Sequence, residues 1–491
     1  MNLGKKVAHN TLLQIIGKII STILGLFALA IITRQLGLGG FGEYTTVLTF
    51  LTFFAVIGDL GLTLVTAQMI SGRNENENKI LNNLFGLRLV SAILILALAP
   101  LTVSFFPYSP AVKFGVLISL GAFLFPALNQ IIIGLFQKKL SMGRDVLAET
   151  ISRLTLIAGI LVVRSFGGGL NGILIATLIS AGVNFIFHYF LSLKFAFIRP
   201  EFDWVIWKKI FNKSWPLAIT IVLNLIYLRA DTLILSLFRS PEEVGLYGAT
   251  YKIIDVLTAI PFMFAGLLLP ILTAAWEENN QTYFKKVLQK SFDFMAIGAL
   301  PLIVGAQFLG RPIMALVAGP DFAAAGNILR VLILAVAAIF LGTIFSHAVI
   351  ALDRQKKMIG FYMFTSLSSL AAYFFLIPRF SYFAAAGVTI YSEVMIAIFS
   401  AYCVFKYSRF WPKLKITAIS LLSSALMGGF LYFFGPRWSG TIIGLLALLI
   451  LSGLIYFAGL LLLGGIKKTD LQMIFKNQKK SSGPVYGGEN L

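Results

Sequence analysis

The chain has 491 residues, of which 58% are apolar and only 12% are charged, and its mean hydropathy is +0.89. A soluble domain is about 25% charged, so this composition excludes a soluble enzyme and, because apolar residues dominate, a disordered chain. In a soluble protein the net charge of +20 would suggest a nucleic-acid partner. Here most basic residues stand in short loops between apolar runs, which is typical of a polytopic membrane protein near anionic lipids. No nucleic-acid partner is therefore expected.

Two residue types that often carry chemistry are scarce. Cys403 is the one cysteine, so neither an internal disulfide nor a cysteine-based metal site is expected. The three histidines, His9, His188 and His347, are widely spaced and do not suggest a zinc or haem centre. We expect no metal and no resident cofactor.

The apolar runs predict the transmembrane helices directly. A bilayer core about 30 Å thick requires about 20 apolar residues per helix. The chain then predicts an all-α polytopic membrane protein with about fourteen transmembrane helices. In chain order they cover residues 10–33, 41–70, 80–105, 112–137, 146–166, 170–196, 212–238, 244–275, 285–309, 325–352, 358–377, 384–407, 414–434 and 440–465.

The distribution of basic residues predicts the orientation. With the N-terminus in the cytoplasm, 27 Lys and Arg residues fall in cytoplasmic segments and 7 in outer loops. This bias follows the positive-inside rule. We expect a multi-pass protein of the cell (cytoplasmic or inner) membrane with both termini in the cytoplasm.

Two short patterns recur and suggest an internal repeat. The pattern hydrophobic-Gly-x-Tyr occurs at residues 41–44 and 244–247, and Gln-Lys-Lys at 137–139 and 355–357. Six helices separate each pair, so the two halves are expected to be parallel and pseudo-symmetric. The alternative is that both patterns are simply common at helix ends. The repeat predicts an N-terminal six-helix bundle (1–196), a cytoplasmic linker (197–211), a C-terminal six-helix bundle (212–407), two extra helices (408–465) and a flexible cytoplasmic tail (466–491).

Charged residues inside the spans are the candidate functional groups. Each costs about 2.5–3.5 kcal/mol to insert, so such residues face a bundle interior or a hydrated cavity. Glu149 and Arg153 (i,i+4) and Lys252 and Asp255 (i,i+3) have the spacing of pairs on one helix face. The intramembrane cations are Lys18, Arg88, Arg153, Arg229, Lys252 and Arg330, and the acids are Asp59, Glu149, Asp231, Asp255, Asp293 and Glu393.

Four of these cations come from both halves of the chain. Lys18, Arg88, Arg229 and Lys252 are predicted to meet in a cleft between the halves. Such a cleft suits an anionic head group, above all a phosphate or pyrophosphate. The alternative is that the cations neutralise the carboxylates as helix-packing pairs.

Three acids are candidates for ion coupling. Asp59, Asp231 and Asp255 could bind Na⁺ or a proton and couple its gradient to movement. The alternative is a fixed counter-ion role, with Asp59 or Asp231 paired to Lys18 or Arg229.

Several segments resemble a known family. Residues 31–37 (IITRQLG), 41–44 (FGEY) and 58–62 (GDLGL) resemble the opening of the polysaccharide-transporter family, the Wzx-like oligosaccharide flippases. Residues 228–232 (LRADT) and 243–247 (EVGLY) resemble the same family. The family belongs to the multidrug/oligosaccharidyl-lipid/polysaccharide exporter superfamily. The resemblance implies two six-helix bundles facing each other around a central cavity, whose arginines and lysines hold a pyrophosphate.

The resemblance implies a flippase that moves a polyprenyl-(pyro)phosphate-linked oligosaccharide from the cytoplasmic to the outer leaflet by alternating access, for cell-surface polysaccharide biosynthesis. Its expected partners are that lipid-linked oligosaccharide, membrane lipids and polysaccharide-assembly proteins. The alternative is an ion-coupled multidrug or small-solute antiporter on the same scaffold. An enzyme is not expected, because the outer loops are short and the histidines are poorly placed for catalysis.

Overall fold

The computed structural model describes residues 3–70 and 77–465, and within these ranges it contains helices and no strand. The predicted tail at 466–491 lies outside the described residues. Twelve helices of the described part are long and apolar enough to cross a membrane, which agrees with the predicted all-α membrane fold.

The helices of the first half of the chain are α1 (Leu3–Asp59), α2 (Leu62–Ile70), α3 (Glu77–Val103), α4 (Pro110–Ile118), α5 (Leu120–Lys138), α6 (Gly143–Ser165) and α7 (Leu170–Ser192). Those of the second half are α8 (Trp204–Phe238), α9 (Pro241–Glu277), α10 (Gln281–Ala318), the short 3₁₀ helix η1 (Pro320–Ala324), α11 (Ala325–Ala351) and α12 (Gln355–Ser408). Two further helices follow, α13 (Lys415–Trp438) and α14 (Ile442–Leu462).

Helices α1 and α12 each contain a sharp break that falls between two predicted spans. Gly37 in α1 has φ 66° and ψ −173°, and Ser381 in α12 has φ 53° and ψ −140°. Neither conformation is helical, and a positive φ costs glycine little because it lacks a Cβ. Ser381 donates a hydrogen bond of 2.9 Å to Glu243 of α9, which helps to hold its less favourable backbone. The count of fourteen crossings and the two six-helix bundles remain predictions.

Three predicted boundaries differ from the structure. The span predicted at 41–70 is interrupted at Leu60 and Gly61, which both have positive φ, and the span predicted at 112–137 is divided at Ser119. Helix α8 begins at Trp204, so residues 204–211 of the predicted linker are helical. The cause of this early start is local, because the Asp203 carboxylate accepts hydrogen bonds from the first amides of α8.

The hydrogen bonds by which Asp203 caps α8 are expected to depend on pH. A hydrogen bond from Lys79 (2.8 Å) and bonds from two backbone amides hold the pKa of Asp203 below its usual value. The cap therefore persists above the ordinary carboxyl pKa and is lost as the pH falls through the lowered value. We expect Asp203→Ala to speed amide hydrogen exchange in the first turn of α8, whereas Asp203→Asn, which can still cap, should not. Equal exchange in both variants would contradict the capping role.

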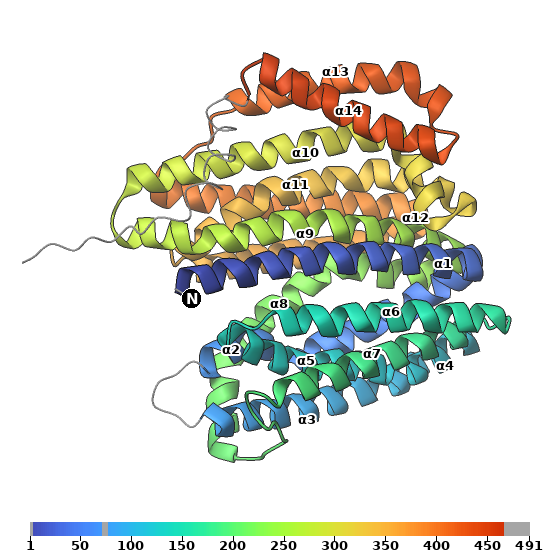
Figure 1. Ribbon diagram of the computed structural model, residues 1–491, viewed down its shortest axis with the longest axis vertical. Coiled ribbons are helices and arrows are strands. Elements are labelled where there is room, and N and C mark those ends of the chain that lie inside the picture. The colour runs from blue at the N-terminus through green and yellow to red at the C-terminus, as the bar shows by residue number, and fades with distance from the viewer. Residues whose placement is uncertain (1–2, 71–76, 466–491) are drawn as a thin grey trace, which may run out of the picture.

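Helix α1 lies between two groups of helices (Figure 1). It packs against α3, α4 and α6 of the first half and against α8, α9 and α10 of the second. The two copies of the hydrophobic-Gly-x-Tyr pattern meet in this packing. A Cβ on Gly42 would lie 1.7 Å from the Pro241 carbonyl oxygen, and one on Gly245 would lie 2.2 Å from the Leu38 carbonyl oxygen. The repeated glycine is therefore required by backbone contact between α1 and α9. We call this contact the glycine seam.

Helices α13 and α14 stack on the outside of α10 (Figure 1). Their contact is a small apolar cluster that includes Leu309, Leu431 and Leu448. Tyr456 of α14 donates a hydrogen bond of 2.7 Å to the Ile297 carbonyl oxygen of α10. This pair therefore adds to the second half without lining the cavities described below.

Candidate functional site

A cavity of about 250 Å³ lies between α1, α6 and α9, and we call it the interface cavity. Lys18 and Tyr44 of α1, Arg153 of α6 and Lys252 of α9 line it. A further cavity of about 340 Å³ shares Lys18 and Ser21 with it and reaches Gln14, toward the N-terminal end of α1. The two halves of the chain thus both contribute cations to one hollow space.

The interface cavity carries uncompensated positive charge. Neither Lys18 nor Lys252 forms an ion pair with a residue that the structure describes, and both are exposed. Arg153 is different, because its guanidinium lies 2.9 Å from Glu149 and so confirms the predicted i,i+4 pair. Ser21 also donates to Glu149 at 3.0 Å. Two lysines, one from each half, are therefore available to an anion.

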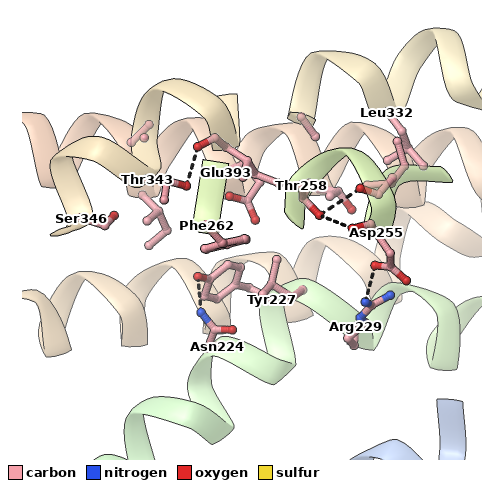
Figure 2. A pocket seen from close by; sticks show the side chains of 18 of the residues that line it. Asn224, Tyr227, Arg229, Asp255, Thr258, Phe262, Leu332, Thr343, Ser346 and Glu393 are labelled. Carbon is pink, nitrogen blue, oxygen red and sulfur yellow. Dashed lines mark hydrogen bonds and ion pairs between the residues drawn. The ribbon is translucent and has the colours of Figure 1, made fainter. Parts of the chain in front are cut away.

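A third cavity, of about 270 Å³, lies within the second half, between α8, α9, α11 and α12, and we call it the C-half cavity. Asp255 lines both it and the interface cavity. Asp255 accepts a hydrogen bond of 2.6 Å from Arg229, as Figure 2 shows. The Arg229 guanidinium also lies 5.1 Å from the centre of the Tyr251 ring. The Arg229–Asp255 pair therefore stands between the two cavities.

The predicted Lys252–Asp255 pair is wrong. Spacing along one helix permitted it, but Asp255 is bonded to Arg229 on the neighbouring helix α8. This arrangement leaves Lys252 without an ion pair to Asp255, although both residues line the interface cavity.

Arg88 and Asp59 form a separate pair away from these cavities. Arg88 is 4% exposed, its guanidinium is bonded to Asp59, and its Nε donates to the Ala127 carbonyl oxygen at 3.0 Å. Asp59 also accepts a hydrogen bond of 2.5 Å from Thr63. The pair lies where α1 ends and α2 begins, so it satisfies polar groups at a helix break within a predicted span. The counter-ion of Asp59 is thus Arg88 rather than Lys18 or Arg229.

Asp231 is fully buried and is held by hydroxyl groups rather than by a cation. Tyr247 donates to it at 2.7 Å and Thr389 at 3.2 Å, and Tyr251 donates to the same carboxylate oxygen. The backbone amide of Thr232 donates to the other oxygen at 2.6 Å. No described residue forms an ion pair with Asp231, so the counter-ion alternative does not apply to it.

The structure therefore brings together four of the seven predicted site residues, Lys18, Arg229, Lys252 and Asp255. It places Arg88, Asp59 and Asp231 elsewhere. Sequence reasoning gave no site role to Glu393, whose carboxylate lines the C-half cavity. A signal for it was present, because no basic residue stands three or four positions from Glu393 in the sequence.

Comparison with protein-family models places the chain in one family. A family model described as "Polysaccharide biosynthesis protein" matches residues 7–276. The chain is 21% identical over 450 residues to the probable flippase AglR of Haloferax volcanii, a match that covers 87% of this chain and 89% of that one. It is 23% identical over 288 residues to the capsular polysaccharide biosynthesis protein CapF of Staphylococcus aureus, covering 58% and 72% of the two chains.

A solved structure shows the same fold. The lipid II flippase MurJ in an inward closed conformation matches with a TM-score of 0.73 at 17% identity, covering 95% of this chain and 99% of that one. The predicted resemblance and the helical membrane fold are both confirmed by these matches.

Proposed function

Because the chain belongs to the polysaccharide biosynthesis protein family, we propose that it flips a polyprenyl-(pyro)phosphate-linked oligosaccharide from the cytoplasmic to the outer leaflet. The names of two relatives, a probable flippase and a capsular polysaccharide biosynthesis protein, support this substrate class. The observation that carries the proposal is the pair of unpaired lysines, Lys18 and Lys252, that face one cavity from opposite halves. The proposed role is transport and not catalysis.

In this proposal the anionic head group binds in the interface cavity. Lys18 and Lys252 neutralise the (pyro)phosphate, and a charge-assisted hydrogen bond to such a group is about twice as strong as a neutral one. Arg229 takes Asp255 as its ion-pair partner, which leaves the ammonium of Lys252 for the substrate. The polyprenyl tail stays in the lipid. Arg88 takes no part in binding here, because Asp59 neutralises it.

The asymmetry of the two ends supports alternating access as the proposed mechanism. The interface cavity continues toward Gln14 near the N-terminal end of α1, whereas the glycine seam closes α1 against α9 beyond Gly37. With the N-terminus in the cytoplasm, this is a state that admits substrate from the inner leaflet. The cytoplasmic termini, coupling to Na⁺ or H⁺ and contacts with polysaccharide-assembly proteins are parts of this proposal.

Substitution of the two lysines tests the proposal. Lys18→Gln and Lys252→Gln are each expected to weaken binding of undecaprenyl pyrophosphate by about tenfold or more, because a hydrogen bond to a charged group contributes about 1.5–3 kcal/mol. The double variant should weaken it further. Binding would be measured by calorimetry on the full chain in lipid nanodiscs. Lys113→Gln is the matched control, since Lys113 lies outside these cavities and bonds to the Ser104 carbonyl oxygen. Unchanged affinity in the double variant would rule out the interface cavity as the anion site.

The alternative, a multidrug or small-solute antiporter, predicts a cavity that attracts cationic drugs. The unpaired lysines of the interface cavity disfavour it, since like charges repel. Efflux of a lipophilic cation from everted vesicles at normal protein abundance would favour the antiporter, whereas loss of glycan export in the lysine variants favours the flippase.

A further inference from the structure

Glu393 is a buried acid that forms no ion pair or hydrogen bond with any residue that the structure describes. Its side chain comes from the second arm of α12, is 8% exposed and points into the C-half cavity (Figure 2). Its Oε1 atom is buried and makes no hydrogen bond with any described residue. In the same cavity Asp255 has Arg229, so the two acids have opposite surroundings.

The titratable and charged groups around Glu393 come from four helices, and they supply no cation to it. Among the described residues that line the cavity, the arginine is Arg229, which is bonded to Asp255. His347 of α11 lies 2.9 Å from the Thr343 carbonyl oxygen through Nδ1. That contact assigns the proton to Nδ1 and leaves Nε2 without one in the neutral ring. The groups that line the cavity are Tyr227 and Arg229 from α8, Tyr251 and Asp255 from α9, His347 from α11, and Tyr362 and Glu393 from α12.

Electrostatics favours the neutral form of such a carboxyl group. An isolated carboxylate in low-dielectric surroundings is costly, and the group takes up a proton instead. Glu393 is nevertheless 8% exposed and lines a cavity with room for water. The cavity has a volume of about 270 Å³ and polar walls that include Asn224 and Ser346, while one water takes up about 30 Å³ of liquid. A proton can therefore reach Glu393 through the cavity and leave by the same route.

We propose that Glu393 is an exchangeable proton-binding site of the C-half cavity. A proton from water binds the carboxylate oxygen and gives a neutral carboxyl, and its return to water restores one negative charge. That charge is felt at the Arg229–Asp255 pair of the C-half cavity, and Asp255 also lines the interface cavity. Loss of the proton from Glu393 thus weakens the binding of an anion at Lys252, and uptake of the proton strengthens it. The link to transport rests on the proposed function, whereas the proton site itself does not.

Chemical labelling tests the site without altering it. Dicyclohexylcarbodiimide modifies protonated carboxyl groups in apolar surroundings, and mass spectrometry locates the product. In the full chain in nanodiscs, Glu393 is expected to be modified and Asp255 is not. Above the pH at which Glu393 ionises, modification should fall about tenfold per pH unit. Glu393→Gln should remove the labelled peptide. Absence of label on Glu393 throughout the pH range overturns the proposal, as does equal labelling of Asp255.

Two further arms separate the alternatives. At constant pH, NaCl and choline chloride should have the same effect on the modification of Glu393 by dicyclohexylcarbodiimide. If NaCl alone reduced this modification, Glu393 would be a Na⁺ site and the proton site would be overturned. In proteoliposomes, a pH gradient is expected to accelerate the translocation of undecaprenyl pyrophosphate by the natural chain but not by the Glu393→Gln variant. If the natural chain translocates nothing while Glu393 still labels as expected, the proposed function fails and the proton site stands.

Discussion

Arg88→Met is expected to lower the free energy of unfolding by about 3–5 kcal/mol, the cost of removing one partner of a buried ion pair. Arg88 and Asp59 are 4% and 8% exposed, so neither water nor lipid head groups can replace the lost charge. The variant also frees the Ala127 carbonyl oxygen, which accepts from Arg88 at 3.0 Å. The measurement is unfolding by sodium dodecyl sulfate in mixed micelles, followed by circular dichroism.

A double-mutant cycle shows whether the pair is the cause. Arg88→Met combined with Asp59→Asn removes both charges and is expected to recover part of the loss, because no unpaired carboxylate remains. Arg164→Met is the matched control, since Arg164 is exposed at the end of α6. If Arg88→Met costs no more than Arg164→Met but weakens pyrophosphate binding, Arg88 belongs to the substrate site as its charge alone suggested. If Arg88→Met lowers stability but still binds pyrophosphate, the role of Arg88 is structural.

The ion pairs of the intramembrane residues show which pairs can be predicted from sequence spacing and which cannot. The Glu149–Arg153 pair was predictable because one helix turn brings the two side chains together whatever the tertiary fold. The Arg88–Asp59 and Arg229–Asp255 pairs join different helices, and periodicity carries no information on which helices become neighbours. The spacing permits a Lys252–Asp255 pair, but the tertiary fold brings Arg229 to Asp255, and Asp255 pairs with Arg229 instead.

The positions of the helices could be predicted from the apolar runs of the sequence. Each crossing must satisfy its own backbone hydrogen bonds within lipid, so the apolar runs and helices largely coincide. The breaks were harder to locate. Ser381 has a positive φ although it is not glycine, and a hydrogen bond to Glu243 from another helix helps to hold it. The early start of α8 was visible in principle, since Asp203 is a good N-cap residue before Trp204.

Gly42→Ala and Gly245→Ala are each expected to destabilise the glycine seam by about 1–3 kcal/mol, the usual cost of overpacking a tight contact. The added Cβ would meet backbone carbonyl oxygens at 1.7 Å from Pro241 and 2.2 Å from Leu38, and backbone cannot rotate away as a side chain can. In an open helix position the same change is expected to stabilise slightly, because alanine is the better helix former. Gly453→Ala in α14 is that control, since no atom lies within 4 Å of its added Cβ.

The seam variants also test alternating access, because the contact that they break must open in the outward state. Spin labels on Gly39→Cys and Ser240→Cys, in a Cys403→Ser background, would report the separation of α1 and α9 at this end. Gly42→Ala is expected to shift the distance distribution toward the separated state, with Gly453→Ala unchanged. A seam that loses stability without separating would mean that α1 and α9 stay joined at this end throughout the cycle. The substrate would then need another exit than the one that the repeated glycines close.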